Sequence, residues 1–422
     1  MILLLGVIVV LFLLIIGTHV AVALGIVAAG LVLFTDGVPI TVIAQTGFKS
    51  VNSYPLMAIP MFVLAGNLMM RGQLAGLIID LVGSLVRVLR GGLALTVLIT
   101  SVFFAAVSGS SVGSAAAIGA ATVDGLRREK YPDRFAAGIV AVGGTLGLMI
   151  PPSLGFILIG TIVGLPIDRL FLAGIMPGLM EASLLMLSVV FLSHKHNYGT
   201  VAKSVDWRGF FTRLPKAFPA LMMPVLVLGA IYAGFMTPTE VSAFAAVYAL
   251  LIAVVIYRTI SMAGVWDAAR DSLLQTTMIY AVVLGGSLIG FILVRMGVSA
   301  QLVSMLQEAD LTWWQFLLIV NGVLLVLGMF LDGVTLIILT APLLFPMAQV
   351  LGISPIHFAV IMVANVEIAT LTPPIGLNLF VMSGIVRIPV HEVARGVLPF
   401  YFVRLFGLGL LTFIPQIALF FE

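Results

Sequence analysis

Four short polar segments interrupt apolar stretches of the chain, and their residue types suit the binding of a small cation. Two are turns rich in Ser, Thr, Gly or Asp, at 108–114 and 332–335, and two contain a Pro-Pro pair, at 147–153 and 370–376. Proline lacks an amide donor, so the carbonyl one helical turn earlier loses its helical hydrogen bond. These carbonyls, with nearby Ser and Thr hydroxyls, are hard oxygen ligands. Helix N-termini at the same breaks offer amide donors to an anion.

The donor types favour sodium over calcium. Asp332 is the only carboxylate in the four segments, whereas calcium sites usually carry several. Each feature also has a structural interpretation: Gly and Ser pack membrane helices closely, and Asp332 can cap a helix. The spacing favours function, because Ser110 and Asp332 each lie 41 residues before the first proline of a Pro-Pro pair.

The elements that carry these segments are membrane helices. Of 422 residues only 9% are charged and 62% are hydrophobic, which excludes a soluble globular protein. The long apolar runs exclude the alternating strands of an outer-membrane barrel. A net charge of +3 provides no basic surface for binding nucleic acid. The lack of cysteine excludes disulfides and thiolate metal sites.

Ten apolar runs are long enough to cross a bilayer, the first being interpreted as a retained span and not as a signal peptide. They lie at roughly 1–17, 19–35, 55–72, 135–163, 171–193, 217–235, 239–257, 277–294, 357–384 and 397–421. Two broken apolar regions, 92–126 and 314–351, and two amphipathic segments, 74–90 and 296–309, complete the pattern. The amphipathic segments suit helices that lie along the membrane surface.

The two halves of the chain match each other at a shift of 222 residues. The shift places Pro151-Pro152 on Pro373-Pro374 and Ser110 on Asp332, and it superimposes the broken regions. We therefore predict two repeats, 1–194 and 217–422, joined by a cytoplasmic linker at 195–216. Each repeat would cross the membrane five times, so the second is inverted relative to the first.

The charges give the orientation and the path of the broken regions. With the linker in the cytoplasm, 16 Lys and Arg lie inside and three outside, as the positive-inside rule requires. Basic residues flank both ends of 92–126, which predicts a re-entrant hairpin from the cytoplasm. The segment 314–351 would enter from the outside, and both termini would be periplasmic.

The pattern resembles the large membrane subunit of tripartite ATP-independent periplasmic (TRAP) transporters along nearly the whole chain. The resemblance is carried by Ser108-Gly109-Ser110-Ser111 after Phe103-Phe104-Ala105-Ala106, by the Gly147–Ser153 break, by Gly328-Met329-Phe330-Leu331-Asp332 and by Thr372-Pro373-Pro374-Ile375-Gly376. It implies an all-α polytopic protein of the bacterial inner membrane, with two inverted repeats and an elevator-type mechanism.

The resemblance also implies coupling ions, partners and a substrate class. Sodium ligands are expected at Ser108, Ser110, Ser111, Gly147, Ile150, Pro152, Gly333, Thr335, Thr370, Thr372 and Pro373. Substrate contacts are expected at Ser153, Asp332 and Asn378. The implied partners are membrane lipids, a small four-helix membrane subunit as a separate chain, and a periplasmic protein that binds an organic anion such as a C4-dicarboxylate or sialic acid.

Three other functions are weighed against this one. The nearest is a sodium-coupled carboxylate carrier of related fold without a binding protein. An intramembrane enzyme would need a nucleophile with its base, and no His or Lys accompanies the Ser108–Ser111 segment in the sequence pattern. A purely structural subunit would not need two matched helix breaks. No phosphate-binding loop is present, so we expect no ATP hydrolysis, no enzymatic activity and no cofactor besides sodium.

Glu367 and Asn365 precede the second break, and Arg404 lies within the last span. Glu367 and Asn365 have two interpretations, cavity lining and hydrogen bonding between helices. For Arg404 we expect snorkelling or pairing with a neighbouring helix or subunit.

Overall fold

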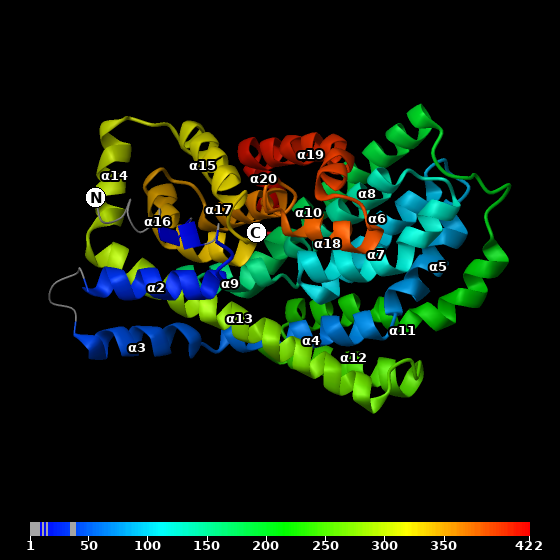
Figure 1. The fold of residues 1–422 in the computed structure, drawn as a ribbon, viewed down its shortest axis with the longest axis horizontal. Helices are drawn as coiled ribbons and strands as arrows, with labels where there is room; N and C mark the ends of the chain where they lie inside the picture. The colour runs from blue at the N-terminus through cyan, green and yellow to red at the C-terminus, as the bar shows by residue number, and fades with distance from the viewer. Residues whose placement is uncertain (1–8, 11, 14–15, 34–38) are drawn as a thin grey trace.

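A computed structural model describes residues 9–10, 12–13, 16–33 and 39–422, and in these ranges the regular structure is entirely helical (Figure 1). Most of the predicted span at 1–17 and the end of the one at 19–35 lie outside these residues. The first half contains α2 (Val20–Leu33), α3 (Ile40–Val51), α4 (Ala58–Arg71), α5 (Leu74–Val86), α6 (Gly92–Ser108), α7 (Ser111–Arg128), α8 (Asp133–Met149), α9 (Leu154–Val163) and α10 (Ile167–His196).

The second half contains α11 (Trp207–Tyr232), α12 (Pro238–Leu251), α13 (Met262–Arg295), α14 (Val298–Glu308), α15 (Trp313–Gly328), α16 (Gly333–Val350), α17 (Pro355–Ala369), α18 (Leu377–Val386), α19 (Val390–Phe413) and the short α20 (Pro415–Ala418). In this half, α14 to α19 follow the same order of long and short helices as α5 to α10. In each half a pair of helices joined by a short turn precedes a helix, a Pro-Pro break and a second helix. Both Pro-Pro peptide bonds are cis.

The helix ends follow local chemistry. At the first turn Gly109 has a φ of 59°, a conformation that glycine adopts without strain, and Ser110 then caps α7 by accepting a hydrogen bond from Gly113 N. At the second turn Asp332 caps α16. The predicted linker at 195–216 is only partly irregular, because α10 extends to His196 and α11 begins at Trp207, capped by the Asp206 side chain.

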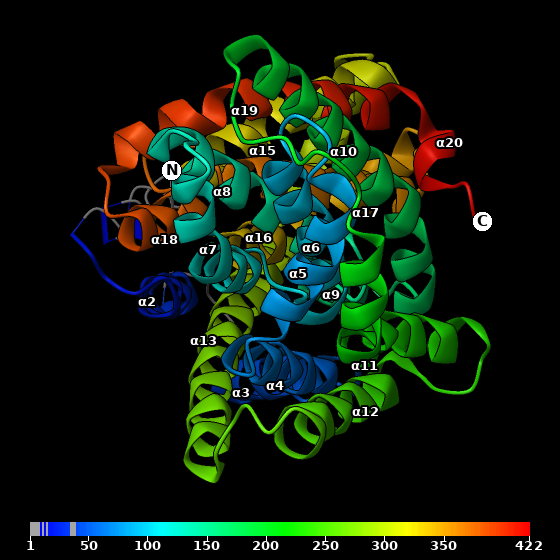
Figure 2. The same ribbon diagram turned by 90° about the vertical axis from the view of Figure 1, so that its right-hand side faces the viewer.

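The helices form two groups. Helices α3, α4, α12 and α13 lie together on one side of the molecule in both views (Figures 1 and 2). On the other side α8 packs against α6, α7 and α19, and α17 packs against α15 and α16. Helix α13 connects the groups, because it contacts α2, α3 and α4 as well as α16. The two turns and the two breaks all belong to the second group.

Seven helices among the described residues are long and apolar enough to span a membrane, or eight if the bent pair 40–51 and 54–71 counts as one span. The prediction of ten crossings therefore exceeds this number. Three predicted spans are not in this count: 1–17 lies mostly outside the described residues, α2 has only 14 described residues, and 357–384 is divided by its break into the short helices α17 and α18. The count also includes α16 (Gly333–Val350), which was predicted as part of a broken, re-entrant region.

Candidate functional site

The first turn packs directly on the first Pro-Pro break. The amide of Leu154 donates to the carbonyl of Gly109 at 3.3 Å. A Cβ atom added to Gly147 would lie 2.8 Å from the Ser110 carbonyl oxygen, and one added to Gly109 would lie 3.0 Å from that of Pro152. Only glycine at these positions permits such an approach of backbone to backbone. The fold thus brings Ser110, Gly147 and Pro152, three of the proposed ion ligands, close together.

Hydroxyl groups cluster at the same turn. The Ser108 and Ser114 hydroxyls are 2.6 Å apart, and Ser108 Oγ also donates to the Ser110 carbonyl at 3.3 Å. Ser114 was not among the predicted ligands, because its spacing fits a helix packing position equally well. Ser111 is buried on the far side of the turn, where it contacts the second half of the chain.

At the first break the two prolines leave the carbonyls of Gly147 and Leu148 without their helical donors. The Ser153 hydroxyl donates to the Leu148 carbonyl, and Ser153 Oγ also accepts from Phe156 N at 3.4 Å, which caps α9. Ser153, predicted to contact substrate, is fully buried in these local bonds. The Gly147 carbonyl, whose helical donor is replaced by Pro151, is the candidate ion ligand at this break.

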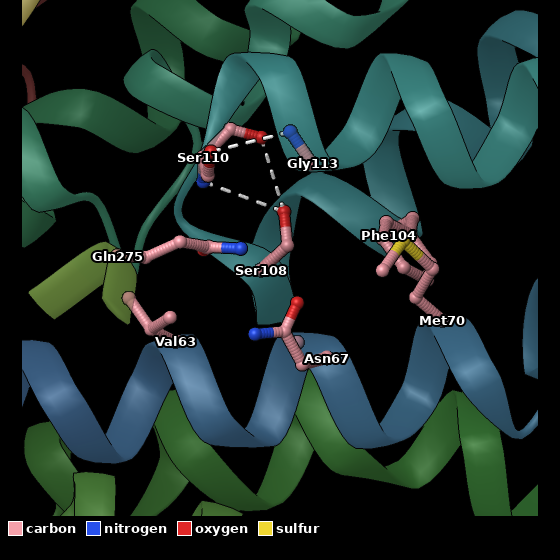
Figure 3. A pocket seen from close by; sticks show the side chains of 9 residues that line it. Val63, Asn67, Met70, Phe104, Ser108, Ser110, Gly113 and Gln275 are labelled. Carbon is pink, nitrogen blue, oxygen red and sulfur yellow. Dashed lines mark hydrogen bonds between the residues drawn. The ribbon is translucent and has the colours of Figure 1, made fainter. Parts of the chain in front are cut away.

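A small cavity lies beside the first turn. Figure 3 shows Ser108 and Ser110 opposite Asn67 on α4 and Gln275 on α13. Its volume is about 20 Å³, enough for one water molecule and too little for an organic anion. The Asn67 amide donates to Ser272 Oγ at 2.8 Å, which joins α4 to α13 under the cavity. The first turn also meets the other helix group directly, because a Cβ atom added to Gly66 on α4 would lie 3.1 Å from Ser108 Cα.

The second turn is joined to the second break in the same manner. The amide of Ile375 donates to the Met329 carbonyl at 3.2 Å. Asp332 accepts from the amides of Val334 at 3.1 Å and Thr335 at 3.3 Å, and also from the Thr335 hydroxyl. The carboxylate of Asp332 therefore acts as a helix cap.

The hydroxyls of the second break bond to their own helix. Thr370 Oγ1 donates to the Glu367 carbonyl at 2.7 Å, and Thr372 Oγ1 donates to the Ile368 carbonyl at 2.8 Å. Gly333 begins α16 so close to α17 that an added Cβ would lie 2.4 Å from Val366 Cγ1. The second turn and the second break thus form one packed unit.

The two breaks differ in exposure. Pro151 and Pro152 are buried, whereas Pro373 and Pro374 are exposed and line an open cavity of about 650 Å³. His391, Arg395 and Tyr401 on α19 line the same cavity. This volume is within the range of small-molecule pockets.

A second large cavity, of about 670 Å³, lies between the two helix groups. It is lined by α3 and α13 on one side and by α9 and α16 on the other. Its polar lining consists of hydroxyl and amide side chains and one lysine: Thr46, Lys49, Ser50, Asn52, Ser53, Thr161 and Ser287. Such groups can donate hydrogen bonds to a carboxylate.

Asn378 connects the two halves of the chain. Its amide nitrogen donates to Ser111 Oγ at 2.7 Å and to the Ala141 carbonyl at 3.0 Å, and the side chain is fully buried. The predicted substrate residues Ser153, Asp332 and Asn378 are each engaged with their own neighbours, and no hydrogen bond among the described residues joins any two of them. Asn378 Oδ1 has no hydrogen-bond partner in the described part of the chain, so it is free to accept one.

A buried ionic cluster accompanies the breaks. Arg404 donates to Glu181 and to Glu367, and all three side chains are at most 2% exposed. Arg404 thus pairs with neighbouring helices, one of the two arrangements expected, and does not snorkel. Glu367 hydrogen-bonds between helices, as does Asn365, whose amide donates to Asn321 Oδ1 at 2.8 Å. Glu181 was missed, because an isolated acidic residue in a long apolar run gives no sign of its partner.

The described residues contain no group of three or more His, Cys, Asp and Glu side chains placed to hold a metal ion. The oxygen atoms present at the turns and breaks are those of backbone carbonyls, of Ser and Thr hydroxyls and of the Asp332 carboxylate.

Comparison with known proteins gives one consistent family. The family model described as "Tripartite ATP-independent periplasmic transporter, DctM component" matches residues 7–417. The C4-dicarboxylate TRAP transporter large permease protein DctM of Pseudomonas aeruginosa is 37% identical over 372 residues, 88% of this chain and 87% of that protein. The sialic acid TRAP transporter large permease protein SiaM of Vibrio cholerae is 34% identical over 407 residues, 96% of this chain and 94% of that protein.

Two further matches extend the comparison. The isethionate TRAP transporter permease protein DctMQ of Oleidesulfovibrio alaskensis is 35% identical over 97% of this chain, which spans 64% of that protein's length. Among solved structures, the YdaH transporter of Alcanivorax borkumensis superimposes with a TM-score of 0.64 at 16% identity, covering 88% of this chain and 87% of that one. The second match is one of fold only.

Proposed function

The chain belongs to the DctM component family of tripartite ATP-independent periplasmic transporters, and from this membership we propose that it catalyses sodium-coupled uptake of an organic anion. It is a multi-pass membrane protein of a permease family, which is not a family of enzymes. The proposed substrate is a carboxylate such as a C4-dicarboxylate or sialic acid, the substrates named for two relatives, whereas a third relative is named for the sulfonate isethionate.

One observation carries the proposal. Each helical turn is hydrogen-bonded to the Pro-Pro break of its own half, through Gly109 and Leu154 in the first and through Met329 and Ile375 in the second. Irregular backbone of this kind inside a membrane protein is stable only in a protein interior or beside a polar cavity. Two matched sites of this kind suit two bound sodium ions, each held by carbonyls and hydroxyls.

The proposed ligands follow from this pairing. The first ion would be held by Ser108, Ser110, Ser111, Gly147, Ile150 and Pro152, and the second by Gly333, Thr335, Thr370, Thr372 and Pro373. Ser153, Asp332 and Asn378 remain the proposed contacts to the substrate, although in this structure Ser153 and Asp332 bond to their own helix ends and only Asn378 Oδ1 has no partner among the described residues.

The moving part of the proposed elevator comprises residues 92–163 and 314–384. The remaining helices form a static scaffold, with α5 and α14 on the membrane surface. The two breaks differ in their surroundings, since Pro373-Pro374 lies exposed beside a cavity of about 650 Å³ whereas Pro151-Pro152 is buried, and the proposed motion would exchange these surroundings. We also propose that the protein lies in the bacterial inner membrane, in contact with its lipids, and that both termini are periplasmic. The segment 195–216 would form the boundary between the two repeats.

The proposed partners are a small membrane subunit and a periplasmic binding protein. A separate small subunit is the arrangement proposed here, whereas one relative carries the combined name DctMQ. Co-purification of this chain with the product of a neighbouring reading frame tests that arrangement. Failure to recover any second chain from the membrane would count against it.

The function is tested by uptake into proteoliposomes that contain both membrane subunits, with binding protein and labelled anion outside. An inward sodium gradient is expected to drive accumulation, and its collapse by a sodium ionophore is expected to abolish it. Undiminished accumulation without the gradient would refute sodium coupling. Transport of free anion by the purified chain alone would support the alternative, a related carrier that needs no binding protein.

A further inference from the structure

One buried cluster joins the two helices that end at the Pro-Pro breaks. The guanidinium of Arg404 on α19 donates through Nη1 to Glu181 on α10 and through Nη2 to Glu367 on α17. The same Nη2 donates to Thr145 Oγ1 on α8 at 2.7 Å. Thr145 and Glu367 are fully buried, so these bonds are shielded from water. A single planar group therefore touches both broken helices.

The cluster lies at equivalent positions of the two halves. A shift of 222 residues places Thr145 on Glu367, each six residues before the first proline of its break. The same shift places Glu181 on Val403, the neighbour of Arg404. Thr145 and Glu367 thus occupy equivalent positions in the two halves, and Glu181 and Arg404 occupy positions that differ by one residue. This position is central to any motion that the two breaks share.

Thr145 and Glu367 each connect the cluster to the Pro-Pro break of their own helix. Thr145 lies two residues before Gly147, whose backbone packs against the Ser110 carbonyl of the first turn. The Glu367 carbonyl accepts a hydrogen bond from Thr370 Oγ1 at the second break, at 2.7 Å. A shift of either helix along its axis would therefore change a bond at Arg404.

The cluster also has unused bonding capacity. Arg404 Nε and Glu367 Oε1 are buried and have no hydrogen-bond partner in the part of the chain that the structure describes. A buried donor and acceptor without partners are costly. They also allow the guanidinium to form a second set of bonds when one helix moves, as a two-state coupling element requires.

We propose that Arg404 is a positioning residue that couples the two cation sites. The inference rests on the proposed function, since it assumes an ion at each break. An ion at one break fixes its helix and, through Arg404, favours the ion-binding arrangement of the other. Coupling of this kind is reciprocal and makes the sodium dependence of uptake cooperative. Glu181 on α10 is the second carboxylate partner of the guanidinium and also lies beside Glu367.

The test is the sodium dependence of uptake by the reconstituted complex, measured together with its thermal unfolding. Thr145→Val removes the hydroxyl that accepts a hydrogen bond from Arg404 and keeps the size and the neutral charge of the side chain. We expect the half-saturating sodium concentration to rise about fivefold or more and the Hill coefficient to fall to about one. The matched control is Thr122→Val, because Thr122 on α7 is equally buried and its hydroxyl bonds only within its own helix, to Ile118. The control should retain wild-type cooperativity.

Arg404→Lys provides the second variant. Lysine keeps the charge but lacks the planar fork that bonds several partners at once, so cooperativity should again be lost. A lower unfolding temperature with an unchanged Hill coefficient in both variants would show a merely structural role and overturn the inference. An absence of sodium dependence in the wild-type complex would instead refute the proposed function, so the two failures are distinguishable.

Discussion

Replacing Gly147 with alanine is expected to separate the first turn from the first Pro-Pro break. The added methyl group would lie 2.8 Å from the Ser110 carbonyl oxygen and 2.9 Å from Ser114 Oγ. Both distances are shorter than a carbon atom tolerates, and the first neighbour is backbone. The turn must therefore move away from α8.

The magnitude follows from two opposing effects. Alanine stabilises a helix interior relative to glycine by about 1 kcal/mol. Overpacking of a close contact costs about 1–3 kcal/mol. The net strain, up to about 2 kcal/mol, falls on the carbonyl and hydroxyl groups proposed to hold the first ion. Because 1.4 kcal/mol corresponds to a factor of about ten in affinity, sodium binding should weaken by up to about thirtyfold.

The assay is uptake in proteoliposomes as a function of sodium concentration, with unfolding in detergent as the measure of stability. Gly322→Ala is the matched control, since Gly322 lies within α15 and an added Cβ would meet no atom within 4 Å. The control should unfold at an equal or higher temperature and keep its sodium dependence. A Gly147→Ala protein with the sodium dependence of the wild type would refute the reasoning.

Three further predictions concern the second turn, the contact between halves and the topology. Asp332→Ala removes the α16 cap and should cost about 0.5–2 kcal/mol of stability, whereas Asp332→Asn keeps a capping oxygen, so equal unfolding temperatures for the two would contradict the assignment. Asn378→Leu leaves Ser111 without its buried partner and should destabilise the protein by about 1–3 kcal/mol with loss of uptake; full uptake would exclude a role for this contact. The chain has no cysteine, so single cysteines at Arg87 and Lys130 can be labelled individually, and both should react from the cytoplasm; labelling from opposite sides would exclude a re-entrant first hairpin.

Much of the local architecture was predictable from sequence. The turn after Ser108 and the turn at Asp332 fall where polar residues interrupt apolar runs, and the helices end at both Pro-Pro pairs. Local chemistry favours such features, since a Pro-Pro pair removes two successive amide donors and Ser or Asp caps the next helix. A single proline is not enough, because α10, α11, α16 and α19 continue through theirs. The predicted linker at 195–216 was too long, because α11 already begins at Trp207 and a charged segment can continue a helix beyond the membrane.

The sequence by itself determined the membrane class, the family, the positions of the turns and breaks, and the residue types available to an ion. Only the tertiary structure decided which groups meet: the Gly109 carbonyl with Leu154, Asn378 with Ser111, and Arg404 with both Glu181 and Glu367. Asn378 and Ser111 are more than 200 residues apart in the chain, and so are Arg404 and Glu181. Such contacts depend on how helices rotate and pack against one another, and a hydrophobic pattern that is apolar on every face does not specify that rotation.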